Sequence, residues 1–198
     1  MNELLYVCAL AVQRFLGNES CNTPQYPFDH MLRVRRFASK ALLGEGGPSS
    51  VFVTGHASPV SLTELFKGKK VLLVGFVGAF TQICQNQFPQ YKARAADFKA
   101  KGLDGVHAVS VNDPVVLKAF ADSMGINDEV SFIADFNGDL VKHLGKSIDL
   151  SAKALGLRST RFAALVDDGK ITKEVVEEQP GMLSKTSAES VLADFFPQ

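Results

Sequence analysis

Three short apolar runs, separated by longer amphipathic segments, constrain the fold of this chain more than any other feature. The runs are KVLLVGF at residues 70–76, GVHAVSV at 105–111 and VSFIAD at 130–135. Continuous apolar runs of this length predict strands that are covered on both faces, as in parallel sheets. Residues 82–101 carry apolar side chains at helical spacing and predict a helix, with Pro89 as its expected kink.

Later segments predict a hairpin and a closing helix. RFAALV at 161–166, the turn DDGK and residues 171–176 have the pattern of two antiparallel strands. Residues 184–195 predict a last helix. Parallel strand–helix–strand units followed by a hairpin and a helix predict an α/β fold of thioredoxin-like order, with a mixed central sheet flanked by helices.

The first 47 residues differ in composition from the remainder, and we expect residues 1–47 to form an N-terminal extension to a domain at 48–198. Residues 31–44 begin with a methionine and combine basic and apolar residues with a serine and no acidic residue. This composition is typical of an organelle transit segment, which predicts a mitochondrial or other organelle protein. A solvated basic arm without a targeting role, in a cytoplasmic protein, is the alternative.

Charge and residue spacing argue against several kinds of partner. The chain has 21 basic and 21 acidic residues, and this balance does not indicate a nucleic-acid-binding surface. The apolar run at 4–12 is too short to span a bilayer, so we expect no membrane partner. The four histidines show no metal-ligand spacing, and we expect neither a metal nor another cofactor.

Cys84 falls between a predicted buried strand and the helix that follows it. The first turn of a helix presents free N–H groups and the positive end of the helix dipole, and both favour the nucleophilic thiolate. Thr81 precedes Cys84 on the same turn, where its hydroxyl is either a hydrogen-bonding partner for the thiol and an incoming oxygen or a plain helix cap. Arg161 opens a hairpin strand and could reach this junction. The alternative is a surface arginine, as we expect for Arg158.

Several ordered motifs resemble one known family. GAFTQIC at 78–84 resembles the active-site segment of the peroxiredoxins, which usually reads PGAFTPxC. Three further stretches resemble the type II, peroxiredoxin-5 subfamily: SVNDPVVLKAFA at 110–121, FIADFNGDL at 132–140 and DLSAKALGLRSTRFAALVDDGKI at 149–171. EEQPGMLSKTSAESVL at 177–192 is similar to the C-terminal helix region of that subfamily.

The resemblance implies a thiol peroxidase that reduces hydrogen peroxide and organic hydroperoxides through a sulfenic acid on Cys84. Thr81 then corresponds to the threonine that hydrogen-bonds the peroxide. Arg161 corresponds to the arginine that polarises the peroxide and holds the cysteine as thiolate, and Gly78 and Phe80 are expected to bind substrate. Such chemistry needs a desolvated thiolate and donors for the leaving oxygen.

The active-site segment also departs from the family pattern. Val77 and Gln82 stand where the family has prolines, and the segment after Cys84 is one residue short and lacks the family histidine. One residue is about 100° of helix, so the face behind Cys84 must change its register or the loop must tighten. These departures leave two alternatives open: a non-enzymatic redox sensor or binding module, and a catalytically weakened paralogue on the same fold.

The resemblance also bears on how the cysteine is recycled. Ala108 and the region of Ser184 stand where relatives carry a second cysteine, so the domain has no resolving cysteine. We expect a one-cysteine mechanism, with glutathione and glutaredoxin, or thioredoxin, as the reductant; resolution by Cys21 is an alternative. The resemblance further implies a homodimer.

Overall fold

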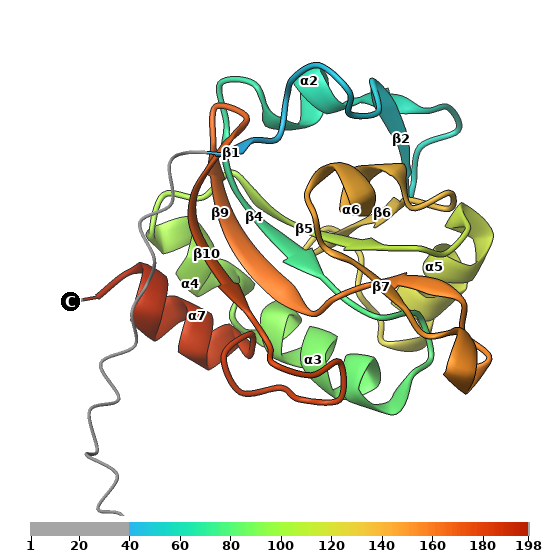
Figure 1. The fold of residues 1–198 in the computed structure, drawn as a ribbon. Helices are drawn as coiled ribbons and strands as arrows, with labels where there is room; N and C mark the ends of the chain where they lie inside the picture. Colours follow the sequence, from blue (N-terminus) through green and yellow to red (C-terminus); the bar gives the residue numbers. More distant parts are fainter. Residues whose placement is uncertain (1–39, 198) are drawn as a thin grey trace, which may run out of the picture. The chain divides into compact units, whose positions relative to one another are not determined.

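A mixed eight-stranded sheet forms the centre of the computed structural model, which describes residues 40–197 (Figure 1). In spatial order its strands are β1 (Lys40–Ala41), β10 (Lys170–Val176), β9 (Phe162–Asp167), β4 (Lys70–Gly75), β5 (Gly105–Ser110), β6 (Ser131–Ala134), β2 (Ser50–Val53) and β3 (Val60–Ser61). The central pairs β4–β5 and β5–β6 are parallel, and the flanking pairs are antiparallel. The predicted α/β class with a mixed sheet is therefore confirmed.

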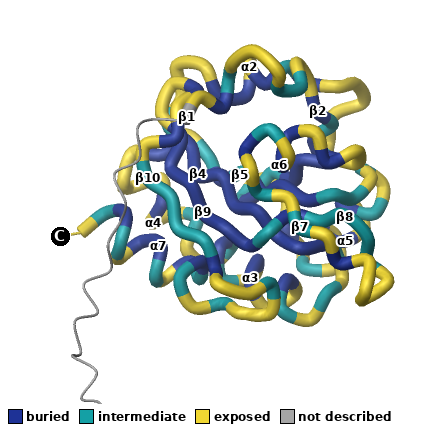
Figure 2. The backbone as a smooth tube through the Cα atoms, viewed as in Figure 1, coloured by how far each residue is buried: buried dark blue, intermediate teal, exposed yellow. Residues whose placement is uncertain are grey.

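Helices cover both faces of the sheet. They are α2 (Leu62–Phe66), α3 (Gln82–Ala93), α4 (Ala95–Ala100), α5 (Pro114–Ser123), α6 (Asp139–His143) and α7 (Ala188–Phe195). Helices α3, α4, α5 and α7 contribute to one buried cluster, and α2 and α6 contribute to the other. Along β4, Leu72 and Val74 face the first cluster while Val71 and Leu73 face the second, which is the two-residue period of a strand. Figure 2 shows β4, β5 and β9 buried along nearly their whole length.

A small second sheet lies beside the main one. Strands β7 (Ser147–Asp149) and β8 (Leu157–Ser159) pair antiparallel, and the 3₁₀ turn η1 (Ser151–Lys153) lies between them. No helix within residues 40–197 is long and apolar enough to cross a membrane.

The break between α3 and α4 falls at Arg94 rather than at the expected kink, Pro89. Helix α3 continues through Pro89, which lies on its exposed side. Water can satisfy the carbonyl that loses its partner there, so the cost of the missing N–H is small. At Arg94 the backbone leaves the helical region (φ −103°, ψ 10°), and the predicted helix over 82–101 becomes two.

The folded domain includes residues that precede the boundary expected at residue 48. Lys40 and Ala41 pair with β10, and Leu42 is fully buried in the core, where its N–H donates to the carbonyl of Gly169 (2.9 Å). Apolar contact with the sheet therefore includes Leu42, which precedes the expected boundary. The transit segment expected within residues 1–47 lies almost wholly outside the described residues and stays a prediction.

His107 on β5 is a titratable group whose pKa the fold shifts strongly. Its ring packs edge-on against Phe66 of α2, with the ring centroids 5.6 Å apart. Burial, and secondly the positive charge of Lys69, lower the pKa of His107 from about 6.5 to about 4. Its Nδ1 is buried and has no partner among residues 40–197.

This histidine predicts a loss of stability in mild acid. The unfolded chain takes up a proton near pH 6.5 and the native chain does so only near pH 4, so the contribution of His107 is complete above pH 6.5 and is lost as the pH falls through this window. We expect His107→Gln to lower the pH dependence of the unfolding free energy by on the order of 2 kcal/mol between these limits. Urea titrations at several pH values measure this, with the exposed His56→Gln as the matched control. If the unfolding free energy depends on pH equally in His107→Gln and His56→Gln, His107 is not the source of the loss of stability in acid.

Candidate active site

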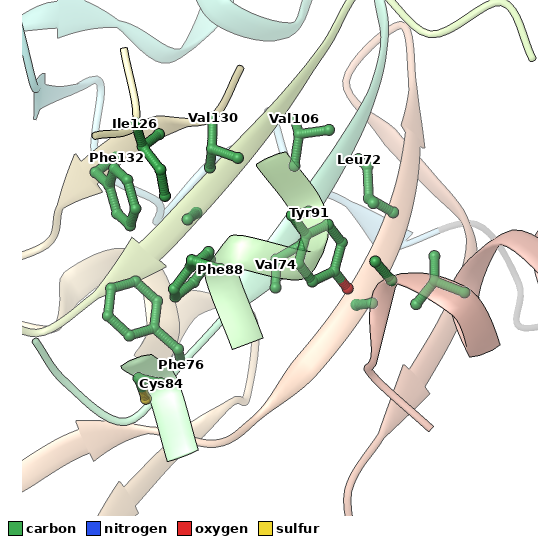
Figure 3. Packing of buried hydrophobic residues seen from close by; sticks show 14 of the residues in the cluster. Leu72, Val74, Phe76, Cys84, Phe88, Tyr91, Val106, Ile126, Val130 and Phe132 are labelled. Carbon is green, nitrogen blue, oxygen red and sulfur yellow. The ribbon is translucent and has the colours of Figure 1, made fainter. Parts of the chain in front are cut away.

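The buried cysteine lies at the start of the helix that follows the central strand β4. Helix α3 begins at Gln82 with Thr81 as its N-cap residue, and Cys84 is its third residue, with no exposed surface. Figure 3 shows Cys84 at the edge of an aromatic cluster that includes Phe76 and Phe88, whose ring centroids are 4.7 Å apart. This wall excludes water from one side of the sulfur. Cys84 is the one free cysteine among residues 40–197.

Sheet register brings Arg161 to this cysteine. Gly75 at the end of β4 pairs with Phe162 at the start of β9, so Arg161 stands where β4 leads into the cysteine loop. The ring of Phe162 occupies the space beside Gly75, where a Cβ would approach it to 2.0 Å. A side chain at residue 75 would therefore push β9 and Arg161 away from Cys84.

Both terminal nitrogens of the Arg161 guanidinium contact the sulfur of Cys84. Nη1 and Nη2 each lie 3.4 Å from Cys84 Sγ. Nη1 also donates to Oε1 of Gln87 (2.5 Å), and Nη2 donates to the carbonyl of Pro180 (3.0 Å). The side chain is buried, at 1% exposure. The alternative of a surface arginine is therefore wrong for Arg161.

No carboxylate forms an ion pair with Arg161 anywhere in residues 40–197. A buried guanidinium without a counter-charge costs several kcal/mol. Cys84 is the one hydrogen-bonded partner of Arg161 that can become an anion, since Gln87 and the Pro180 carbonyl are neutral. Arg161 therefore places a positive charge without an ion-pair partner, and two hydrogen-bond donors, against the sulfur of Cys84.

Thr81 borders the same site but does not cap the helix with its side chain. Its hydroxyl donates to the carbonyl of Gly78 (3.0 Å), and no capping hydrogen bond forms. This bond uses the single hydroxyl proton and leaves the oxygen free to accept from a ligand. Thr81 therefore occupies the N-cap position of α3, but its side chain does not cap the helix.

The other two expected substrate residues, Gly78 and Phe80, lie on the loop between β4 and α3. Gly78 is buried against Arg158, whose Nη1 would lie 2.8 Å from a Cβ at that position. Phe80 has a left-handed backbone (φ 59°), is half-exposed, and packs against Phe120 with the ring centroids 5.3 Å apart. Neither residue lines the pocket described next, so their role in substrate binding stays a prediction.

A pocket of about 160 Å³ opens in front of the guanidinium. It is lined by Val77, Thr81, Gln82, Ile83, Leu150, Lys153, Leu155, Arg161, Pro180 and Gly181. Both residues that replace the family prolines are therefore pocket walls. The lining is mostly apolar, and its polar residues are Thr81, Gln82, Lys153 and Arg161.

Arg158 is partly buried, and its expected surface location is wrong. Its Nε donates to the carbonyl of Leu155 (2.8 Å), and Nη1 donates to the carbonyl of Val111 (3.2 Å). The side chain thus joins the pocket wall at Leu155 to the end of β5 and to Gly78. The sequence around Arg158 offers no signal that distinguishes it from an exposed arginine.

Sequence reasoning also missed the role of Gln87, which is fully buried on α3. Its Oε1 accepts from Arg161, and its Nε2 donates to the carbonyl of Thr186 (3.1 Å). Tyr91, one turn further on, donates to the same carbonyl (2.8 Å). Spacing carried a signal, since residues three apart share a helix face and Gln87 lies three after Cys84.

The segment that Gln87 and Tyr91 contact is itself held by a buried carboxylate. Glu177 accepts from the backbone N–H (2.8 Å) and the hydroxyl (2.9 Å) of Thr186, and from the N–H and hydroxyl of Ser184. Burial alone would raise the pKa of Glu177, but these hydrogen bonds together lower it below its usual value. Burial, and secondly the charge of Glu177, raise the pKa of Tyr91 far above its usual value. The network therefore holds an ionised carboxylate and a neutral phenol at neutral pH.

No cluster of three or more potential metal-ligating side chains occurs among residues 40–197. The fold has a mixed α/β sheet, and a cysteine on the first turn of a helix contacts a buried arginine. Together these features define a thiol-based redox protein. The chemistry available to such a site is nucleophilic attack by sulfur.

Comparison with known proteins identifies the family. The profile of the Redoxin family matches residues 42–192. Peroxiredoxin-2F, mitochondrial, from Arabidopsis thaliana is 44% identical over 77% of this chain and 74% of its own length, and Peroxiredoxin-2C from Oryza sativa subsp. japonica is 48% identical over 67% and 82%. The chain belongs to the Redoxin family and, within it, to the type II peroxiredoxins, which makes it a thiol-dependent peroxidase.

Solved structures show the same fold. Reduced Prx3 in complex with H₂O₂ from Vibrio vulnificus superposes with a TM-score of 0.68 at 35% identity, over 76% of this chain and 92% of that one. Peroxiredoxin 5 from Alvinella pompejana gives a TM-score of 0.62 at 29% identity, over 70% and 90%. The expected thioredoxin-like fold is confirmed.

The contacts of Gln87 predict that it supports both folding and thiol reactivity. Gln87→Ala removes the acceptor for Arg161 and the donor to Thr186, so we expect the free energy of unfolding to fall by about 1–3 kcal/mol. We also expect slower alkylation of Cys84 at neutral pH, since Arg161 loses one of the bonds that orient it. Urea denaturation and alkylation kinetics measure the two effects. Gln85→Ala, an exposed glutamine on the same helix, is the matched control, and equal behaviour of the two variants would rule out this role.

Proposed function

We propose that this protein reduces hydrogen peroxide and organic hydroperoxides by forming a sulfenic acid on Cys84, with Arg161 and Thr81 as the other catalytic residues. The observation that carries the proposal is the double contact of the Arg161 guanidinium with Cys84 Sγ, 3.4 Å from each terminal nitrogen, while no carboxylate among residues 40–197 forms an ion pair with Arg161. A thiolate is the nucleophilic form of cysteine, and a buried cation beside the sulfur favours it.

In the proposed reaction the Cys84 thiolate attacks the terminal oxygen of a hydroperoxide, ROOH. The S–O bond forms as the O–O bond breaks, and the sulfur is oxidised to the sulfenic acid, Cys–SOH. The departing RO⁻ takes a proton from solvent and leaves as alcohol, or as water when the substrate is hydrogen peroxide. Two electrons pass from sulfur to the peroxide, and each atom of the peroxide is accounted for.

Arg161 has one donor that no atom of residues 40–197 uses. Its Nε–H is buried and has no hydrogen-bond partner, while the terminal nitrogens are occupied by Cys84, Gln87 and Pro180. We assign this free donor to the leaving oxygen, where negative charge develops as the O–O bond breaks. Thr81, which donates to Gly78, accepts from the O–H of the peroxide and so orients its terminal oxygen toward the sulfur.

Return of Cys84 to the thiolate requires an external thiol. The described part of the chain holds no second cysteine, which supports a one-cysteine mechanism. A thiol R′SH condenses with Cys–SOH to give a mixed disulfide and water. A second thiol then releases the Cys84 thiolate, with R′SSR′ and a proton as the other products. Glutathione with glutaredoxin, or thioredoxin, is the proposed reductant; the alternative resolving residue, Cys21, lies outside the described residues.

We also propose a homodimer in an organelle. The half-exposed Phe80, on the loop between β4 and α3, offers apolar surface for a second copy of the chain. The mitochondrial name of the Arabidopsis relative and the transit-like composition of residues 31–44 support the location. Sedimentation of wild type and Phe80→Ser tests the dimer. Imaging of the full-length protein beside a variant that starts at residue 40, and so keeps β1 and the buried Leu42, tests the targeting.

The proposed roles of Cys84 and Arg161 predict distinct defects. We expect Cys84→Ser to abolish oxidation, because no thiol remains in the domain. We expect Arg161→Met to slow oxidation by roughly 100-fold or more, since the site loses its charge and its oxygen donor. Stopped-flow measurements with hydrogen peroxide and tert-butyl hydroperoxide give the rates, and mass spectrometry after peroxide and glutathione identifies the product on Cys84.

Arg161→Lys is the control variant, because it keeps the buried charge and loses the two-pronged contact. Near-UV circular dichroism verifies that each variant is folded. Wild-type Cys84 that reacts with both peroxides no faster than free cysteine would overturn the proposal and would favour a redox sensor or a weakened paralogue.

A further inference from the structure

Charge is distributed unevenly around the pocket that Arg161 lines. Its lining contains two cations, the buried Arg161 and the exposed Lys153, and no carboxylate. The ammonium group of Lys153 forms no ion pair or hydrogen bond with any other side chain among residues 40–197. A pocket lined by one sign of charge concentrates ligands of the opposite sign.

Lys153 lies at the pocket on a turn that backbone hydrogen bonds hold together. It ends the 3₁₀ turn η1, where its N–H donates to the carbonyl of Leu150 (2.8 Å). Ala154 follows in the left-handed conformation (φ 56°), which reverses the chain so that the N–H of Leu155 also donates to Leu150 (3.2 Å). Asp149 accepts from the N–H of Ser151 (2.8 Å) and fixes the start of the turn. A non-glycine residue in this conformation is held there by its surroundings.

The same turn supplies apolar wall. Leu150 and Leu155 line the pocket on either side of Lys153 in the sequence, and Val77 and Ile83 line it from the cysteine loop and α3. A ligand that fills this pocket therefore meets apolar side chains on its way to Arg161 and a free cation at the rim. The volume of about 160 Å³ is on the order of five water molecules, so it admits the segment of a ligand that carries the peroxide and not a whole large molecule.

We propose that Lys153 is a specificity residue that recognises the carboxylate of hydroperoxides in which an apolar chain separates the peroxide from an acidic end. This inference rests on the proposed peroxidase function and names a substrate class for the same site. The peroxide end reaches Cys84 past Val77 and Leu150, and the carboxylate stays at the rim near the Lys153 ammonium. The chemical step is unchanged: sulfur takes the terminal oxygen, and the departing alkoxide is protonated to a hydroxy acid.

The test compares an acid with its ester, which differ in charge and share the peroxide and the chain. Linoleic acid hydroperoxide and its methyl ester, below the concentration at which they aggregate, oxidise Cys84 in stopped-flow experiments. The measured quantity is the acid-to-ester ratio of rate constants within each variant, divided by the same ratio for free cysteine. Any change in the intrinsic reactivity of Cys84 cancels from this ratio.

We expect wild type to prefer the acid, and Lys153→Gln to reduce that preference roughly three- to fivefold, as for a solvent-exposed ion pair. Lys153→Glu should shift the preference to the ester. Salt should lower the wild-type ratio and leave that of Lys153→Gln almost constant. Lys99→Gln makes the same charge change at an exposed lysine of α4 that does not line the pocket, and its ratio should match wild type.

Four results overturn the inference. A wild-type ratio equal to that of free cysteine, or one that Lys153→Gln leaves unchanged, shows that Lys153 does not select acids. An effect of Lys153→Gln confined to the later reaction of the sulfenic acid with glutathione, itself a carboxylate, shows that Lys153 recognises the reductant instead. Failure of wild type to react faster than free cysteine with any peroxide, tert-butyl hydroperoxide included, overturns the proposed function together with this inference.

Discussion

The guanidinium of Arg161 is buried without a carboxylate partner, and its charge has to be balanced by what surrounds it. It makes contacts with the sulfur of Cys84, the amide of Gln87 and the carbonyl of Pro180. These groups come from the first turn of α3, its second turn and the loop that follows β10. Loss of any one contact leaves a buried donor unsatisfied, which costs about 1–3 kcal/mol. The interaction that prepares the sulfur for reaction thus also joins three segments of the fold.

Backbone register makes this interaction possible. The antiparallel pairing of Gly75 with Phe162 places the start of β9 beside the end of β4, and the absence of a side chain at residue 75 allows the Phe162 ring to lie there. Arg158 donates to the carbonyl of Leu155, which lines the pocket, and to the carbonyl of Val111. The active site is therefore positioned by sheet pairing and by arginine-to-backbone bonds, not by the cysteine loop alone.

Departures from the family pattern have different consequences in three dimensions. Val77 keeps an apolar wall where the family has proline, and Gln82 lies at the exposed rim, where its polarity needs no buried partner. Within the shortened segment after Cys84, Gln87 accepts a hydrogen bond from Arg161. Gln87 also donates to the carbonyl of Thr186, whose N–H donates to the carboxylate of Glu177. The face behind the cysteine is thereby filled with a satisfied polar network, which is the condition for a buried polar group to be tolerated.

By itself the sequence determined the α/β class, the strands at the centre of the sheet and the place of Cys84 at a strand–helix junction, because apolar runs and helix starts are local patterns. It did not determine that α3 ends at Ala93, that Arg158 is partly buried, or that Gln87 is a partner of Arg161. Only the tertiary structure decided these points. The Arg161–Cys84 contact joins residues 77 positions apart, and Gln87 meets Thr186 across 99 positions. Such contacts depend on strand register and on packing between segments distant in the chain, which no local pattern encodes.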